Sequence, residues 1–142
     1  MSALLVLALL ANVSGNVLLA RRRDSSLWSV PGAVLRARTV SRMEYLAACC
    51  RRQVGVTPVF VAPLVTVDLA GITAMIGVDE VPADSVRACG RVGETKWFSP
   101  DALPVDLAPV ARLAIATHFQ RRSATLLERR ALEPQLAPVE AC

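Results

Sequence analysis

Three polar side chains in the middle of the chain have the types and the spacing of a binding or reactive site. Cys49, Arg52 and Gln53 stand three and four residues apart, so in a helix they would share one face. A guanidinium can hold a phosphate or a carboxylate through paired hydrogen bonds. A thiol beside a guanidinium can have a lowered pKa and act as a nucleophile, although a small residue that only fills space would give the same pattern.

The helix that would carry these residues is marked at both ends. Ser41 and Glu44 form a Ser-x-x-Glu capping box, and Gly55 followed by an apolar residue stops the helix. We therefore expect a helix over residues 41–54. Its apolar residues recur at helical spacing, and the predicted buried stripe consists of Met43, Leu46, Ala47, Cys50 and Val54.

Apolar runs separated by turn residues predict the elements around this helix. The predicted strands are 3–11, 17–20, 27–30, 57–70, 72–81 and 86–92. The first two are expected to form a hairpin across Ser14-Gly15-Asn16, and a Pro31-Gly32 turn is expected to lead the chain out of the sheet into a loop at 34–40. A final helix is expected over residues 107–120, with an amphipathic continuation at 123–132.

The stretch from Trp28 to Gly55 resembles the Nudix box, in which a strand ending W-x-x-P-G leads through a loop to a helix carrying R-E-x-x-E-E-x-G. The matching residues are Trp28, Pro31, Gly32, Ser41 and Gly55. The resemblance covers about residues 3–120 and implies an α/β (α+β) fold. In that fold, a Nudix-like α/β/α sandwich, a mixed and mostly antiparallel sheet lies between the helices at 41–54 and 107–120.

The resemblance stops at the residues that carry the family's chemistry. With the helix register set by Ser41, the family's arginine falls on Ala48, and the glutamate of its loop falls on Val40. Its three helical glutamates correspond to Cys49, Arg52 and Gln53. Mg²⁺ prefers oxygen ligands, which a thiol and a guanidinium do not supply. We therefore expect no metal and no cofactor, and we do not expect the usual metal-dependent hydrolysis.

Two further segments resemble parts of the same family. Residues 17–23 are similar to its V-L-L-x-x-R-R segment, in which a basic residue can reach substrate phosphate; Arg21 is the candidate here, and a solvated strand end is the alternative. Residues 94–104 are similar to its E-x-x-W-x-x-x-x-x-L-P segment. An acidic residue near that strand sometimes serves as general base or extra ligand, which makes Glu94 a catalytic candidate.

The resemblance also implies a ligand pocket over the N-terminal strands and the Cys49 face of the helix. Arg52 would be its main anion contact, and Trp28 or Trp97 would bound it. The catalytic candidates are Cys49, Glu94 and His118, and the ligand-binding candidates are Arg52, Gln53, Arg36, Arg38, Arg21, Trp28 and Trp97. A hydrogen-bonded histidine at a helix end is the ordinary alternative for His118. An internal salt bridge to Glu94 is the alternative for Arg52.

Length and composition limit the class of protein. The 142 residues favour one domain at 1–122, followed by a helical extension and flexible tail at 123–142. The net charge of +4 is too diffuse for a nucleic-acid surface. The apolar N-terminal run is too short to span a bilayer, and its flanking charges are opposite to those of a secretory signal. We expect a cytoplasmic protein with no nucleic-acid and no membrane partner.

Three functions are compatible with these features. The first is a repurposed, metal-independent enzyme or binding protein that acts on a small anionic or diphosphate-related metabolite. The second is a catalytically silent sensor or assembly module, and the third is a conventional nucleoside-diphosphate-type hydrolase with non-standard metal ligands. The third ranks lowest because Glu44 lies about 140° around the helix from Cys49 and points away from the ancestral metal face. A homodimer is the oligomer we expect for a domain of this size.

Overall fold

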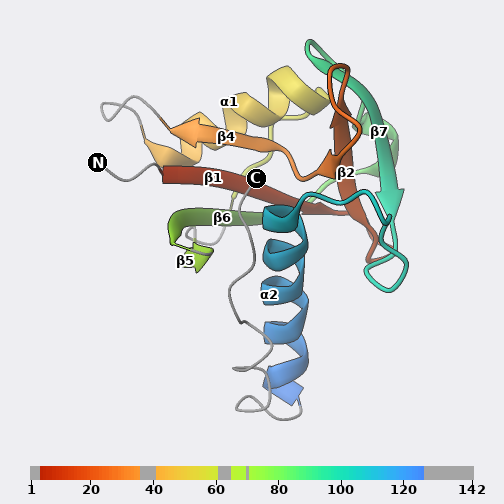
Figure 1. Ribbon diagram of the computed structural model, residues 1–142. Coiled ribbons are helices and arrows are strands. Elements are labelled where there is room, and N and C mark those ends of the chain that lie inside the picture. The colour runs from red at the N-terminus through yellow and green to blue at the C-terminus, as the bar shows by residue number, and fades with distance from the viewer. Residues whose placement is uncertain (1–3, 36–40, 61–64, 70, 127–142) are drawn as a thin grey trace.

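The computed structural model describes residues 4–35, 41–60, 65–69 and 71–126 of the chain (Figure 1). Within these ranges lie seven strands, two α-helices and one short 3₁₀ helix. The strands are β1 (Leu4–Ala11), β2 (Val17–Arg22), β3 (Trp28–Ser29), β4 (Gly32–Leu35), β5 (Val65–Leu69), β6 (Ile72–Glu80) and β7 (Val92–Phe98). The helices are α1 (Arg42–Val54), η1 (Ala83–Ser85) and α2 (Pro109–Leu126).

Strand β1 lies at the centre of the sheet. Along one edge it pairs in parallel with β6 over its whole length. Along the other edge its first half pairs antiparallel with β4, and its last residue, Ala11, lies opposite Val17 of β2. β5 pairs antiparallel with β6, and both β3 and β7 pair antiparallel with β2. The sheet is therefore mixed and mostly antiparallel, as the sequence predicts.

Both faces of β1 are buried. Successive side chains of a strand point to opposite faces, and the two sets from β1 enter two separate hydrophobic clusters. Leu7 and Leu9 pack in the cluster that includes α2, whereas Val6, Ala8 and Leu10 pack in the cluster that includes α1. The two helices thus cover opposite faces of the sheet (Figure 1), which confirms the predicted α/β/α sandwich.

The ends of α1 are those the sequence predicts. Ser41 is the N-cap, and its hydroxyl oxygen accepts a hydrogen bond from the Glu44 N–H at 3.5 Å. Gly55 ends the helix in the left-handed conformation, with φ of 78°. The predicted stripe is confirmed in part: Leu46, Cys50 and Val54 are buried, while Met43 and Ala47 are half-buried. Cys49, which was expected on a separate face, is also fully buried.

The predicted strand over residues 86–92 is wrong. The backbone N–H groups of Arg87 and Cys89 donate to the carbonyls of Val54 and Gln53, at 3.0 and 3.1 Å. The last carbonyls of an α-helix have no partner within the helix, so this segment is held by the end of α1 and not by the sheet. Strand β7 begins only at Val92.

The connections on either side of the sheet also differ from the prediction. The segment after the Pro31-Gly32 turn forms β4 before the chain reaches residues 36–40, which lie outside the described ranges. Of the predicted strand at 57–70, the structure describes a strand only at 65–69; residues 57–60 have no regular structure, and 61–64 and 70 are not described.

The last helix begins and ends later than predicted. Ala108 N–H donates to the Trp28 carbonyl at 2.8 Å, and this bond beside β3 delays the start of α2 to Pro109. The helix then continues past the predicted end at residue 120 as far as Leu126, into the segment predicted as its continuation at 123–132. The remaining residues of the predicted extension, 127–142, lie outside the described ranges. None of the described helices is long and apolar enough to cross a membrane.

Two glycines allow a test of how closely the Pro-Gly turn is packed against β1. Both Gly15 and Gly32 have positive φ, but a Cβ at Gly15 would meet no atom within 4 Å, whereas one at Gly32 would lie 2.1 Å from the Val6 carbonyl oxygen. We expect Gly15→Ala to lower the free energy of unfolding by about 1–2 kcal/mol, the cost of the backbone conformation alone. Gly32→Ala adds a steric clash and should lower the free energy of unfolding by about 3–5 kcal/mol. Urea denaturation measures both losses. Equal losses for the two variants would contradict this packing.

Candidate functional site

The residues at the positions of the family's helical glutamates lie together on α1. The Arg52 guanidinium donates to the sulfur of Cys49 at 3.5 Å, and Gln53 follows on the same side of the helix. The predicted grouping on one helix face is therefore present. Each of the three side chains, however, is in a different environment.

Gln53 holds the Pro-Gly turn against α1. Its Nε2 donates to the Gly32 carbonyl at 2.9 Å, and its Oε1 accepts from the Gly32 N–H at 3.1 Å. A neutral amide can both donate and accept, whereas a carboxylate can only accept. The Tyr45 hydroxyl adds a third bond between α1 and this segment, donating to the Val34 carbonyl at 3.0 Å. In the structure Gln53 is thus engaged with the backbone of the protein.

Cys49 has the opposite of the environment that a nucleophilic thiol needs. Its side chain is 0% exposed. Burial raises the pKa of Cys49, and the Arg52 charge and hydrogen bond lower it only in part. Burial, with smaller contributions from Cys49 and Asp79, raises the pKa of the neighbouring Cys50 to about 12. Both thiols are therefore protonated and shielded at neutral pH, which disfavours the catalytic role considered for Cys49.

Arg52 is the exposed member of the group. Its guanidinium donates a hydrogen bond to the Cys49 sulfur. Among the residues that the structure describes, no carboxylate pairs with Arg52. The salt bridge to Glu94 that we considered as an alternative is not formed, because Glu94 pairs with Arg21. Part of the Arg52 guanidinium is thus available to a ligand.

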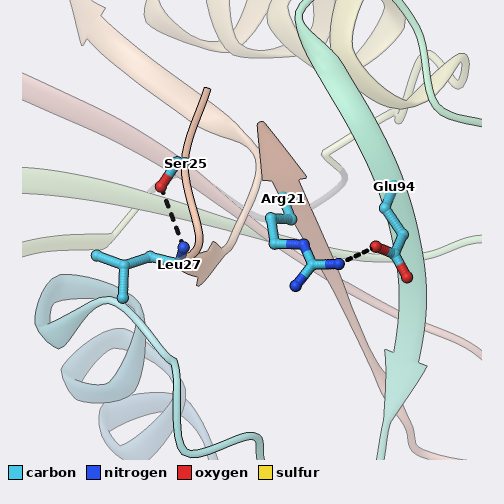
Figure 2. Close-up of polar contacts among 4 residues, drawn as sticks. All are labelled: Arg21, Ser25, Leu27 and Glu94. Atoms are coloured by element: carbon cyan, nitrogen blue, oxygen red, sulfur yellow. Dashed lines mark hydrogen bonds and ion pairs between the residues drawn. The ribbon is translucent and has the colours of Figure 1, made fainter. Parts of the chain in front are cut away.

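Arg21, Glu94 and Trp28 form a separate group at the edge of the sheet. Arg21 and Glu94 face each other across β2 and β7, and Figure 2 shows the Arg21 guanidinium directed at the Glu94 carboxylate. The Arg21 guanidinium carbon also lies 4.7 Å from the centre of the Trp28 ring. In the adjacent turn the Leu27 N–H donates to the Ser25 hydroxyl oxygen at 3.1 Å (Figure 2). Two of the predicted site residues, Arg21 and Glu94, therefore neutralise each other.

The two tryptophans lie on opposite faces of the sheet. Trp28 packs in the cluster that includes α2, whereas Trp97 packs against the cluster that includes α1, and its Nε1 donates to the Ala83 carbonyl at 3.3 Å. Cys49, Arg52 and Gln53 belong to α1. Trp97 therefore lies on the same face of the sheet as these three residues, and Trp28 lies on the other face. The structure divides the predicted site residues into two groups.

Three of the predicted site residues cannot be placed. Arg36 and Arg38 lie outside the described ranges. His118 belongs to α2, but its side chain is not described. Their roles remain predictions from the sequence.

The residues of the α1 face do not fit Mg²⁺. A buried thiol, a guanidinium and an amide bonded to Gly32 provide no carboxylate oxygen, and the charge of Arg52 would repel a divalent cation. Across residues 4–35, 41–60, 65–69 and 71–126, no three His, Cys, Asp or Glu side chains are grouped so that they could hold a metal ion. The donor set of the α1 face therefore does not match the oxygen ligands that Mg²⁺ prefers.

Sequence reasoning missed a basic pocket of about 310 Å³ between the end of β2 and the start of β7. Its lining residues are Arg22, Arg23, Asp24, Gly90 and Arg91. The run of arginines at 21–23 was a visible signal in the sequence. Its partner segment was not, because residues 86–92 were predicted to form a strand and not a turn.

The burial of Cys49 and Cys50 leads to a direct test. With iodoacetamide at pH 7.5, we expect native protein to be alkylated at Cys89, which is partly exposed, and at least about a hundredfold more slowly at Cys49 and Cys50. Peptide mass mapping would locate the label, and protein unfolded in guanidinium is the control in which all these thiols should react. Alkylation of native Cys49 as fast as Cys89 would show that the thiol is accessible and reactive.

Solved structures of Nudix proteins are similar to this fold. The NUDIX domain of Shewanella oneidensis NrtR, complexed with ADP-ribose, is 18% identical, with coverage of 86% of this chain and 89% of that chain and a TM-score of 0.69. A putative nudix hydrolase family member from Chromobacterium violaceum is 17% identical, with coverage of 96% and 94% and a TM-score of 0.70. The MutT protein from Methanosarcina mazei Go1 is 25% identical, with coverage of 86% and 95% and a TM-score of 0.58.

Protein-family models gave no match to this sequence, and neither did curated protein sequences. The likeness therefore rests on three-dimensional structure: a mixed sheet centred on β1, with α1 and α2 on opposite faces. Together with the Trp28, Pro31, Gly32 and Gly55 positions, which frame α1 as in the Nudix box, these comparisons show that the chain has the Nudix fold.

Proposed function

We propose that this chain binds a small phosphate-bearing metabolite at the α1 face, with Arg52 as the principal anion contact and without a catalytic metal. The observation that carries the proposal is the state of the three former glutamate positions. They hold a shielded thiol, an exposed guanidinium and an amide bonded to the Pro-Gly turn. An exposed guanidinium is suited to a phosphate group, to which it can donate two parallel hydrogen bonds.

Two of the three catalytic candidates, Cys49 and Glu94, support binding over catalysis. Cys49 is buried with a raised pKa, and the Glu94 carboxylate is paired with Arg21. Glu94 also lies in a different group from Arg52, since Arg21 stacks on Trp28, which belongs to the cluster that includes α2. A general base must lie within hydrogen-bond reach of the proton that it removes. For a ligand held by Arg52, none of these groups provides that arrangement.

The choice of a first ligand follows from a structural neighbour. The Shewanella oneidensis domain was solved as a complex with ADP-ribose, a nucleotide-like molecule with a diphosphate. A diphosphate carries the charge and the acceptor oxygens that a guanidinium binds well. ADP-ribose is therefore the first ligand to test, with pyrophosphate as its minimal anionic part.

Calorimetric titration of ADP-ribose into matched variants tests the role of Arg52. Arg52→Gln is expected to weaken binding by about tenfold or more, because a hydrogen bond to a charged group contributes about 1.5–3 kcal/mol. Arg51→Gln is the control: Arg51 is also exposed, loses the same charge and lies about 100° around the helix. Equal affinities for the two variants would remove Arg52 from the site.

A second titration tests the absence of a catalytic metal. We expect Mg²⁺ and Mn²⁺ to show no saturable binding at submillimolar concentration, because the α1 face lacks carboxylate ligands. Incubation of ADP-ribose with the protein and Mg²⁺ should release no more AMP than the same mixture with EDTA. Submillimolar Mg²⁺ affinity together with metal-dependent release of AMP would support the conventional hydrolase instead.

A further inference from the structure

We infer that the outer edge of β7 is an interaction surface for a second copy of this chain, which pairs with it antiparallel and so continues the sheet. Such pairing brings Glu94 of each copy opposite Lys96 of the other. The size of the domain alone led us to expect a homodimer, and the edge of β7 gives that dimer a specific surface. The inference does not depend on the ligand proposed for the α1 face.

Strand β7 lies at an edge of the sheet. One side of β7 pairs with β2 from Val92 to Phe98, whereas β1 and β3 pair with the opposite side of β2. Figure 1 shows β7 as the outermost strand on that side. Among the residues that the structure describes, no strand pairs with the outer side of β7. The N–H and C=O groups along this side can therefore bond to another strand.

The outer edge of β7 carries two opposite charges. Glu94 and Lys96 are both exposed, and they lie on the same face because alternate side chains of a strand point to the same side. The Lys96 ammonium group lies 5.4 Å from the centre of the Phe98 ring. In the described ranges it has no carboxylate partner. Lys96 is therefore available to a carboxylate of a second molecule.

These charges favour one register between two copies. When a two-fold axis perpendicular to the sheet relates the copies, their β7 strands run antiparallel, and opposite side chains lie on the same face. With the axis at Thr95, each Glu94 faces the Lys96 of the other copy. With the axis one residue earlier or later, two Glu94 or two Lys96 side chains face each other. Like charges directly opposite destabilise a pair of strands, so the pairing is centred on Thr95.

The ion pair between Arg21 and Glu94 does not prevent this contact. Arg21 belongs to β2 and reaches Glu94 from the inner side of β7, whereas the second copy approaches from the outer side. The Glu94 side chain is still 49% exposed. A carboxylate has two oxygens and can accept hydrogen bonds from two cations. In the dimer, Glu94 therefore bridges Arg21 of its own copy and Lys96 of the other.

The length of the edge limits the strength of the dimer. The register of β7 with β2 shifts at Gly93, so β7 has an irregularity there. A bulge bends its strand and disrupts regular pairing. The two copies therefore pair regularly over only a few residues on each side of Thr95. Small interfaces are typical of transient complexes, and we expect a dissociation constant on the order of 100 µM.

A second copy fits this edge better than it fits the edge at the other end of the sheet. β5 forms that other edge, and its only charged residue is Asp68. Two β5 strands thus have no opposite charges to place across from each other. A lysine on an edge strand usually hinders pairing. In β7, a glutamate two residues away offsets that effect for a second copy, which carries the same Glu-Thr-Lys sequence.

Sedimentation equilibrium of charge-reversed variants tests this surface. We expect Glu94→Lys and Lys96→Glu each to weaken dimerisation by about tenfold or more, because like charges then meet in both cross-strand pairs. An equal mixture of these two variants should form a heterodimer, since the charges of one complement those of the other. Arg42→Glu is the control: Arg42 is exposed at the other end of α1, has the same charge change as Lys96→Glu and should alter dimerisation by less than about twofold.

A cross-link in the wild-type protein tests the register without any variant. Lys96 is the only lysine of the chain. A carbodiimide joins an amine directly to a carboxylate that touches it. In a mixture of isotope-labelled and unlabelled protein, we expect it to join Lys96 of one copy to Glu94 of the other, as peptide mass spectra would show.

The outcomes decide between this surface and its alternatives. A wild-type protein that stays monomeric at about 500 µM overturns the inference, because Lys96 would then only protect the edge. Equal dimerisation of Lys96→Glu and Arg42→Glu, or a dimer without the cross-link to Glu94, also overturns it. Association of the two mixed variants supports it and shows that both are folded. None of these results depends on ADP-ribose binding by Arg52, so the proposed function can fail separately.

Discussion

The structure depends on β1, a strand that is buried on both faces and carries only apolar side chains. Because its side chains contribute no polar group, its backbone N–H and C=O groups must be satisfied by neighbouring strands along both edges. β6 does this along one edge, and β4 and then β2 do it along the other. The change from β4 to β2 opens the sheet on that side and places the Pro-Gly turn against α1. The position of the candidate site thus follows from the pairing of one strand.

The parts of the fold that the sequence predicts well are those with local signals. The limits of α1 follow from Ser41 and Gly55, whose side chain and backbone act within one turn of the helix. The strand at 3–11 is a continuous apolar run, as expected for a strand buried on both faces. The segment at 86–92 has a strand-like composition, but hydrogen bonds to the end of α1 decide its conformation. Such long-range bonds leave no pattern in the local sequence.

In the candidate site, too, the features with local signals are predicted from the sequence and those set by distant residues are not. Helical periodicity is sufficient to group Cys49 with Arg52, because their spacing fixes their relative positions. It does not determine how deeply a side chain is buried, since that depends on the strands beneath the helix, and Cys49 is fully buried. The pairing of Arg21 with Glu94 joins residues 73 positions apart and follows from the register of β2 with β7. A single sequence does not specify that register.

The reciprocal hydrogen bonds between Gln53 and Gly32 have a consequence for how this protein could change. A carboxylate at position 53 could accept from the Gly32 N–H but could not donate to the Gly32 carbonyl. A change toward metal ligation would therefore pass through a variant with an unsatisfied Gly32 carbonyl, at a cost of about 1–3 kcal/mol of stability. That cost comes before any ligand set is complete, because positions 49 and 52 would still lack carboxylates. The amide at position 53 therefore makes a single substitution to a carboxylate unfavourable unless the residues around Gly32 also change.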